Sequence, residues 1–470
     1  MAFTRHEILR VSLGDPERKG AMNVELNSQP ECNYYTSLVR NLKTAIIPTF
    51  TLESGQQLHR VPIAYNAWGT LNEEGDNVLL ICHALTGSSD VEDWWKPLIG
   101  RGKAIDTSRF FAICFNSLGS PYGSASPLST NPITGKPYGP SFPDTTFRDD
   151  VRIQKMVLDT LGVKRIASVI GGSMGGMIAL EWPLCTPPGY VKTIIPVSTS
   201  AYQTAWGISW NTSQIRCIQA DSQFRGGYYA PHPQSQPAQG LGAARMIGML
   251  TYRSYTSFES RFGRRKSGSK QPSQSFSRPM TSLPSPPPTE AGDDIPETAA
   301  SKREAQNFGP ITIYSAQSYM QYQADKFLKR FDANCYIHLL RKMDSHDITR
   351  GRTATMLLSS EEHPSTESVA AVLATCTAPA LVVSIDSDLL FPSEQQTLLA
   401  NSLPRAKLMK LDSSDGHDGF LLEMSAMEES ISTFLRGHNA NIFEGPVFGG
   451  DEDDNGEVVT DSVFGELESF

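Results

Sequence analysis

A serine enclosed by glycines is the feature of this sequence with the clearest chemical meaning. Residues Gly171–Gly176 read Gly-Gly-Ser-Met-Gly-Gly and contain the pattern G-x-S-x-G around Ser173. The apolar run Ile166–Ile170 precedes this pattern, and the apolar run Met177–Leu180 follows it. On a tight strand-to-helix turn a serine is raised above the sheet, and glycines let the strand and helix close around it. The pattern therefore predicts a nucleophile elbow with Ser173 as the nucleophile.

A base for Ser173 is expected later in the chain. A serine hydroxyl is a weak nucleophile without such a base, and with this elbow the order is serine, acid, histidine. His417 follows the apolar run Lys407–Leu411, which places it at the sheet edge where Ser173 also lies. The other interpretation of His417 is an ordinary loop histidine. His338 and His346 fall in a region without strands and are expected to be structural.

The acid of this set is expected after the apolar run Ala380–Ile385. Asp386 and Asp388 both follow that run. Asp388 lies further out in the loop and is the preferred choice, whereas Asp386 is expected to cap the turn. The acid would hold the imidazole in one tautomer and stabilise its charged form. Ser173, Asp388 and His417 together form the predicted catalytic triad.

Two backbone N–H groups are predicted to stabilise the negative oxygen of the intermediate. The first belongs to Met174, directly after the nucleophile. The second comes from a loop after an earlier strand, where Leu85 in the segment His83–Gly87 is the preferred residue. His83 itself is expected to be a structural residue of this loop rather than a base.

Short apolar runs alternate with stretches of helical spacing, and this alternation predicts how the chain positions these groups. The strand candidates are Val78–Cys82, Phe110–Phe115, Ile166–Ile170, Thr193–Val197, Ala380–Ile385 and Lys407–Leu411. The helix candidates are Asp149–Leu161, Leu241–Tyr252 and Ser315–Leu340. Buried strands alternating with helices predict an α/β fold, with a mostly parallel sheet and helices on both of its faces.

The region from about 200 to 372 lacks this strand rhythm and is interpreted as a helical lid inserted between two strands. Within it, residues 264–307 are rich in Ser, Pro and basic residues and are predicted to be a disordered loop. The basic start of this loop is alternatively a site for an acidic partner. The expected organisation is an N-terminal extension (1–43), a first core part (44–199), the lid (200–372), a second core part (373–437) and an acidic tail (438–470).

Composition limits the partners and the compartment of the protein. The 470 residues carry a net charge of −9, and residues 451–470 hold eight acids and no Lys or Arg. The rest of the chain is nearly neutral, unlike a nucleic-acid-binding protein. The seven cysteines are widely spaced without a CxxC pair, which favours reduced thiols over disulfides or a zinc site. Because no signal peptide or membrane-spanning run is found, we expect a cytoplasmic protein. No metal-ligand cluster or phosphate-binding glycine loop stands out, so no metal and no bound cofactor are expected.

Several segments in chain order carry a family resemblance. They are His83–Gly87, Asn116–Ser120, Gly123–Ala125, Gly172–Gly176, Leu250–Arg253, Ser257–Phe262, Phe331–Tyr336 and Gly416–Phe420. These motifs resemble the homoserine O-acetyltransferases, and most of all their fungal branch. The resemblance covers about residues 45–435, apart from the insertion.

The resemblance implies an acyltransferase of the α/β-hydrolase fold with a helical lid. Its members make O-acetylhomoserine from acetyl-CoA and L-homoserine, a step toward methionine. The resemblance places Ser173, Asp388 and His417 at the triad positions. It further implies that Asp418 meets the amine of the amino acid and that Tyr229 belongs to the substrate site. Acetyl-CoA would be a co-substrate, a homodimer is kept as a candidate assembly, and no nucleic-acid or membrane partner is expected.

One segment departs from the family pattern and bears on the acceptor. The family has Gln-Arg-Gln in the first lid helix, and its Arg is taken to bind the substrate carboxylate. Here Gln214 is followed by Ile215, and Arg216 comes one place late, which on a helix is about 100° of rotation. Either the helix is re-registered so that Arg216 serves, or carboxylate binding has changed.

Three other functions are kept as alternatives. The same chemistry on L-serine or deacetylcephalosporin C would fit the altered segment. A plain serine hydrolase needs the same triad with an open site, and the expected lid argues against it. A non-catalytic interaction protein would not need Ser173, Asp388 and His417 together. An assay of acetyl-CoA with each acceptor, scored for CoA release and product, separates these functions.

Overall fold

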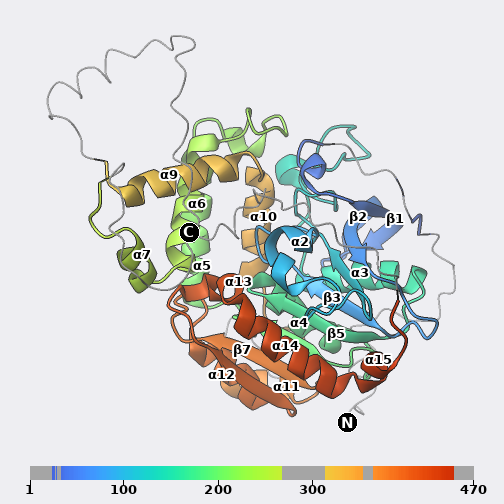
Figure 1. The fold of residues 1–470 in the computed structure, drawn as a ribbon. Coiled ribbons are helices and arrows are strands. Elements are labelled where there is room, and N and C mark those ends of the chain that lie inside the picture. Colours follow the sequence, from blue (N-terminus) through green and yellow to red (C-terminus); the bar gives the residue numbers. More distant parts are fainter. Residues whose placement is uncertain (1–23, 27, 29–32, 267–312, 353–363, 449–470) are drawn as a thin grey trace, which may run out of the picture.

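The computed structural model describes residues 24–26, 28, 33–266, 313–352 and 364–448. One eight-stranded sheet runs through it in the order β1-β2-β4-β3-β5-β6-β7-β8 (Figure 1). From β4 to β8 neighbouring strands are parallel, and β1 and β2 extend that end of the sheet by antiparallel pairing. The predicted α/β fold with a mostly parallel sheet is therefore confirmed. The strands are β1 (Lys43–Thr51), β2 (Gln57–Trp68), β3 (Val78–Cys82), β4 (Phe111–Phe115), β5 (Ile166–Gly172), β6 (Ile194–Val197), β7 (Ala380–Ile385) and β8 (Ala406–Leu411).

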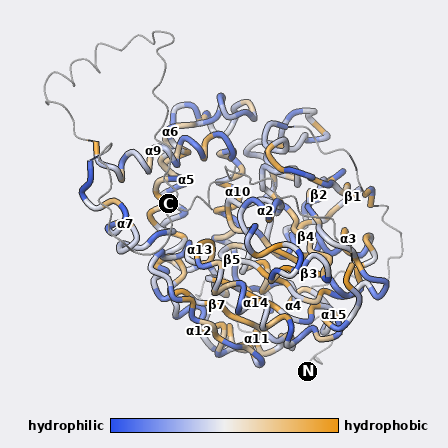
Figure 2. The backbone as a smooth tube through the Cα atoms, viewed as in Figure 1, coloured by the Kyte–Doolittle hydropathy of each residue, from blue (hydrophilic) through white to orange (hydrophobic). Residues whose placement is uncertain are grey.

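The central strands form from continuous apolar runs because both faces of the sheet are covered. Successive side chains alternate between two apolar clusters: Leu80 and Val169 face one cluster, whereas Ile81 and Ile170 face the other. Figure 2 shows the hydrophobic residues gathered along these strands. The first cluster packs under α3 (Phe147–Thr160), α4 (Met174–Cys185), α11 (Thr366–Leu373) and α12 (Ser393–Ser402). The second packs under α2 (Val91–Trp95), α13 (Gly419–Leu422), α14 (Met424–His438) and α15 (Ala440–Glu444).

The hairpin of β1 and β2 is missing from the expectation based on sequence. Pro48 and Pro62 interrupt its apolar runs, and proline is tolerated in a sheet mainly at edges and irregular positions. β1 is the edge strand of the sheet, which explains how it accommodates Pro48. Arg60 has φ of 50°, so the alternation of β2 is broken there. The six strands that the sequence does predict agree with the structure to within two residues.

Helices between β6 and β7 form a layer over the carboxyl ends of the parallel strands. α5 packs against α6 and α10, and α6 packs against α9. The stretch Ser315–Leu340, predicted as one helix, is two helices instead. The chain breaks after Leu328, and the Asp332 carboxylate begins the next helix by accepting the N–H of Cys335 at 3.0 Å. The helices are α5 (Ala205–Ala220), α6 (Ala238–Tyr252), α7 (Tyr255–Arg261), α9 (Ser315–Leu328) and α10 (Ala333–Asp344).

Three predicted segments lie mostly outside the described residues. They are the N-terminal extension, the insertion 264–307 beyond residue 266, and the acidic tail beyond residue 448. The first residues assigned to that tail do form structure, since α15 packs Ile442 against the core and the Arg109 guanidinium donates to the Phe443 carbonyl at 2.6 Å. Among the described helices, none is long and apolar enough to cross a membrane.

Candidate active site

Ser173 lies at the turn between β5 and α4, with φ of 58° and ψ of −124°. Residues with a Cβ rarely adopt a positive φ, so the turn is strained and its surroundings must hold it. Two glycines make the close packing possible. A Cβ on Gly175 would lie 2.1 Å from the Cys82 carbonyl oxygen, and one on Gly172 would lie 2.6 Å from the Phe420 ring. The glycine pattern thus holds Ser173 at the carboxyl end of β5, beside a pocket.

Asp388 and His417 meet at the rim of the same pocket. Nδ1 of His417 lies 2.7 Å from Oδ2 of Asp388, and both side chains are buried. The second carboxylate oxygen of Asp388 accepts the backbone N–H groups of Leu390 and Phe391 at 2.8 and 2.9 Å. These bonds fix the carboxylate, and because a carboxylate accepts, Nδ1 of the imidazole is the nitrogen that donates to it.

Apolar and aromatic side chains hold the His417 ring in place. The ring centroids of Phe391 and Phe420 lie 5.4 and 5.5 Å from that of His417, and the Tyr252 ring lies 6.2 Å away. Ser173 and His417 both line the pocket. The triad residues, predicted from three distant parts of the sequence, are therefore gathered at one place.

Asp386 is not part of this cluster. Its side chain is 63% exposed and pairs with Lys410 at 3.3 Å. The loop after β7 therefore turns Asp388, and not Asp386, toward His417.

Of the two predicted backbone donors, Met174 adjoins Ser173 in the chain, and Leu85 lines the same pocket. Met174 is the first residue of α4, so its N–H has no acceptor within the helix. Leu85 lies in the loop after β3 and lines the pocket together with Ser173. Both N–H groups sit where the positive end of α4 and the β3 loop meet, a setting that favours negative charge.

His83 fixes the loop that carries Leu85. Its ring is fully buried; Nδ1 donates to the Ala84 carbonyl at 2.7 Å, and Nε2 accepts the N–H of Ser117 at 3.1 Å. Both ring nitrogens are used, which agrees with a structural role for this histidine.

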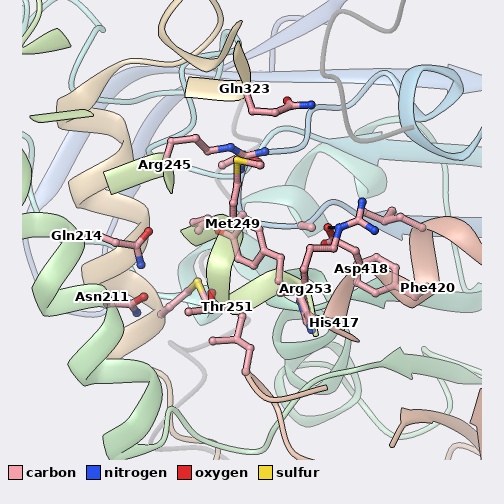
Figure 3. Close-up of a pocket in the computed structure, with 18 of the residues that line it drawn as sticks. Asn211, Gln214, Arg245, Met249, Thr251, Arg253, Gln323, His417, Asp418 and Phe420 are labelled. Carbon is pink, nitrogen blue, oxygen red and sulfur yellow. Dashed lines mark ion pairs between the residues drawn. The ribbon is translucent and has the colours of Figure 1, made fainter. Parts of the chain in front are cut away.

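The opposite wall of the pocket comes from the lid helices. Figure 3 shows Asn211, Gln214 and Arg245 on one side and Arg253, His417 and Asp418 on the other. The wall residues from the lid helices are Asn211 and Gln214 of α5, Arg245, Met249, Thr251 and Tyr252 of α6, Tyr319 and Gln323 of α9, and Met343 of α10. The site is therefore a chamber with polar and apolar walls, lined by both the core and the lid.

Asp418, next to the candidate base, lines this chamber. Its Oδ2 pairs with Nε of Arg253 at 3.0 Å, and the same guanidinium pairs with Asp415 at 3.0 Å. The pKa of the nearby Tyr319 hydroxyl is raised to about 12 by burial and by Asp418, although Arg253 and Arg245 oppose the shift. Tyr319 therefore stays protonated at neutral pH, among charges of both signs.

Two predicted substrate residues lie away from the chamber. Arg216 is exposed on α5 and donates to Gln219 at 3.4 Å. Gln214 faces the pocket, and two places further along a helix is about 200° of rotation, so Arg216 points elsewhere. Its position therefore does not support the prediction that a re-registered helix brings Arg216 to the substrate.

Tyr229 is likewise engaged elsewhere. Its hydroxyl donates to Asp332 at 3.0 Å and accepts the N–H of Asn334 at 2.8 Å, which supports the start of α10. Burial and the charge of Asp332 raise its pKa well above the ordinary value. Its position does not support the predicted substrate contact, since it does not line the chamber among the described residues.

Arg245 is not among the residues predicted from the sequence, although its surroundings in the sequence carry a signal. In α6, whose sequence is AQGLGAARMIGMLTY, Arg245 is the single charged residue, and it is buried. A lone arginine in an apolar helix is costly unless its charge serves a structure or a ligand. Among the described residues, no cluster of His, Cys, Asp and Glu that could hold a metal ion is found.

The chain is similar to known proteins in both sequence and fold. A family model of the alpha/beta hydrolase fold matches residues 77–423. A homoserine O-acetyltransferase of Cryptococcus neoformans var. grubii is 43% identical, over 94% of this chain and 97% of that protein. The crystal structure of homoserine O-acetyltransferase from Bacillus anthracis is 25% identical with a TM-score of 0.67, covering 84% of this chain and 97% of that one. The crystal structure of esterase E22 is 27% identical with a TM-score of 0.66, covering 84% and 99%.

Proposed function

The chain belongs to the homoserine O-acetyltransferase family of the α/β-hydrolase fold, and from this premise we propose how it acts. It moves an acetyl group from acetyl-CoA to the hydroxyl of L-homoserine, a step toward methionine. Ser173 is the nucleophile, His417 the base, and Asp388 the residue that orients the base. Acetyl-CoA is a co-substrate that leaves as CoA after each cycle.

The first half of the reaction acetylates Ser173. Nε2 of His417 takes the hydroxyl proton as Oγ attacks the carbonyl carbon of the thioester. The N–H groups of Leu85 and Met174 stabilise the negative oxygen that forms. The carbon–sulfur bond then breaks, and the proton on His417 passes to the sulfur of the departing CoA. Asp388 orients the imidazole and stabilises the imidazolium that forms.

The second half transfers the acetyl group to the acceptor. His417 takes the proton of the homoserine hydroxyl, whose oxygen attacks the acetyl-serine, and the proton returns to Ser173 as the ester bond breaks. Asp418 accepts the acceptor's ammonium group, because its carboxylate lines the chamber beside His417. The lid wall supports transfer over hydrolysis, since water competes for the same intermediate.

One observation carries this proposal. His417, which is buried and lies 2.7 Å from Asp388, lines the same chamber as Ser173 on its strained turn. A non-catalytic protein has no reason to maintain a strained serine beside an oriented imidazole.

Compartment and assembly are part of the same proposal. The enzyme is placed in the cytoplasm, which the six free cysteines of the described residues support, because reduced thiols are typical of that compartment. A homodimer is the assembly proposed from the sequence. Light scattering of the purified chain measures whether it forms this dimer.

The test is an acceptor panel with the purified full chain. Acetyl-CoA is supplied with L-homoserine, L-serine, deacetylcephalosporin C or no acceptor, and CoA release and acetylated product are scored. We expect product with homoserine at a rate far above the other acceptors and above acceptor-free CoA release. Ser173→Ala should abolish it, whereas Ser213→Ala, an exposed serine on α5, should not. Turnover retained by Ser173→Ala would disprove the assignment, and CoA release that needs no acceptor would favour a hydrolase.

A further inference from the structure

The walls of the chamber bear charged groups on two sides. Asp418 and Arg253 lie on the side of His417, and Arg245 projects from α6 on the other side (Figure 3). An α-amino acid acceptor bears an ammonium and a carboxylate on the same carbon. A chamber that binds it by charge therefore needs an acidic and a basic group facing one space.

Arg253 is engaged by protein carboxylates. Its guanidinium pairs with both Asp415 and Asp418 at 3.0 Å, which balances its charge within the wall. A substrate carboxylate placed there would meet two negative groups of the protein. Arg253 is therefore a poor partner for it.

Arg245 has a different environment. Its side chain is 6% exposed, and its guanidinium carbon lies 4.9 Å from the ring centre of Phe327 and 5.6 Å from that of Tyr252. Contacts with ring faces use the flat side of a guanidinium, whereas its N–H groups point outward in the plane. That in-plane edge fits the two oxygens of a carboxylate.

The amide side chains beside Arg245 are held by the lid. Gln214 accepts from the Tyr336 hydroxyl at 2.6 Å and donates to the Trp210 carbonyl at 3.2 Å. Asn211 donates to Asp344 at 2.7 Å. These bonds make both amides part of the wall rather than the main binders of a charged ligand.

Tyr319 links the two sides of the chamber. Its pKa responds to Asp418 and Arg253 on one side and to Arg245 on the other. The acidic and basic groups thus act on the same small volume, next to the acyl-accepting serine.

We propose that Arg245 binds the α-carboxylate of the acceptor, opposite Asp418, and so sets the specificity for an amino acid. This inference rests on the proposed function and names the residue of that site that reads the carboxylate. It also explains how the chain works with Ile215 in α5 and Arg216 turned to solvent.

The experiment compares two acceptors that differ only in the carboxylate: L-homoserine and 3-amino-1-propanol. For Arg245→Met we expect kcat/KM for L-homoserine to fall about 100-fold, because the carboxylate loses its charged partner. The value for 3-amino-1-propanol should stay within about threefold of the wild type. Arg245→Lys, which keeps the charge without the planar fork, should recover part of the preference. The matched control is Arg216→Met, which should leave both values unchanged.

Each outcome bears on the inference. A loss with Arg216→Met and none with Arg245→Met would overturn it, as would an equal loss for both acceptors with either Arg245 variant. Acetylation of Ser173 by acetyl-CoA alone is measured in the same proteins and should be retained in Arg245→Met. If the wild-type protein is not acetylated, the proposed function itself fails. If it is acetylated but neither Arg245→Met nor Arg245→Lys changes the preference for L-homoserine over 3-amino-1-propanol, only the role of Arg245 fails.

Discussion

Ser173 combines a strained backbone with tight surroundings, and that combination is what its sequence pattern encodes. A φ of 58° at a serine persists because β5 and α4 approach so closely that Gly175 has no room for a Cβ beside Cys82. In the proposed mechanism the N–H of Met174, the next residue, stabilises the negative oxygen. The proposed nucleophile and one proposed donor therefore come from one local turn.

The orientation of His417 depends on a single carboxylate, and this gives a prediction at the scale of one residue. Asp388→Asn should keep the fold but present an amide to Nδ1, which favours the wrong tautomer. We expect kcat for acetyl transfer to fall by about 10⁴-fold, with little change in thermal stability. Steady-state kinetics with acetyl-CoA and L-homoserine measure it.

Asp386→Asn is the matched control for that variant. It lies two residues away, is exposed and pairs only with Lys410 among the described contacts. Its activity should equal that of the wild type. Equal losses in the two variants would show that the loop, and not the Asp388–His417 bond, is what matters.

Ser173, Asp388 and His417, which the structure brings together, could be selected from the sequence because each follows a strand in a fixed order, and strands are recognisable as apolar runs. Arg216 and Tyr229 are different, because their directions depend on helix rotation and on partners far away in the chain. Tyr229, for example, is taken up by Asp332, which lies 103 positions along the chain. Side chains on lid helices are placed by tertiary packing, which the local sequence does not specify.

At the scale of elements, the link between α6 and α7 holds the loop that bears His417. Arg253 pairs with Asp415 and Asp418 on either side of the histidine. Gly416 has φ of 73°, and a Cβ there would lie 2.7 Å from the Ser254 nitrogen. The end of α6 and the loop that bears His417 are therefore packed against each other.

Removing the ion pairs of Arg253 should disturb the position of the loop that bears His417. For Arg253→Met we expect kcat/KM to fall about 100-fold, because Asp418 and the His417 loop lose their common anchor. Arg253→Lys should restore part of it. Stopped-flow measurement of CoA release reports the acetylation step, and thermal unfolding reports whether the variant is folded. Arg225→Met, an exposed arginine in the lid, should behave as wild type; an unchanged acetylation rate in Arg253→Met would contradict the link.

Most strands of the sheet could be predicted from the sequence, but the β1–β2 hairpin and the break between α9 and α10 could not. The sequence predicts six of the eight strands, since buried parallel strands are continuous apolar runs. It misses β1 and β2, where prolines and the positive φ of Arg60 hide the strand pattern. It also joins α9 to α10, although the N-cap at Asp332 marks the break.

At the scale of the whole molecule, burial extends to several titratable groups outside the site. Lys342 of α10 pairs with Asp150 of α3, and both side chains are fully buried. Burial lowers the pKa of His338 to about 3, and Lys342 and Arg341 add to this effect. The neutral His338 ring contacts Thr145 at 2.8 Å, which joins α10 to the core.

This buried histidine predicts how stability depends on pH. In the unfolded chain His338 takes up a proton below its ordinary pKa of 6.5, whereas in the folded chain it does so only near 3. Its contribution to stability is therefore complete above pH 6.5 and is lost progressively as the pH falls toward 3. Within that window the loss is about 1.4 kcal/mol per pH unit from this residue.

His338→Gln removes this titration and isolates its effect. Urea unfolding of both proteins at pH 7, 6 and 5 should show the wild type losing stability relative to the variant at each step down. His59→Gln, an exposed histidine on β2, should give a curve parallel to the wild type. Parallel curves for His338→Gln would contradict the assignment.

The proposed mechanism requires Ser173 to carry the acetyl group between donor and acceptor. Mass spectrometry of the full chain, mixed with acetyl-CoA and quenched before any acceptor is added, detects that intermediate. We expect one acetyl group per chain, located on Ser173 and absent from Ser173→Ala, and its removal as O-acetylhomoserine when L-homoserine is added. Product formation at full rate without an acetyl group on Ser173 would contradict it.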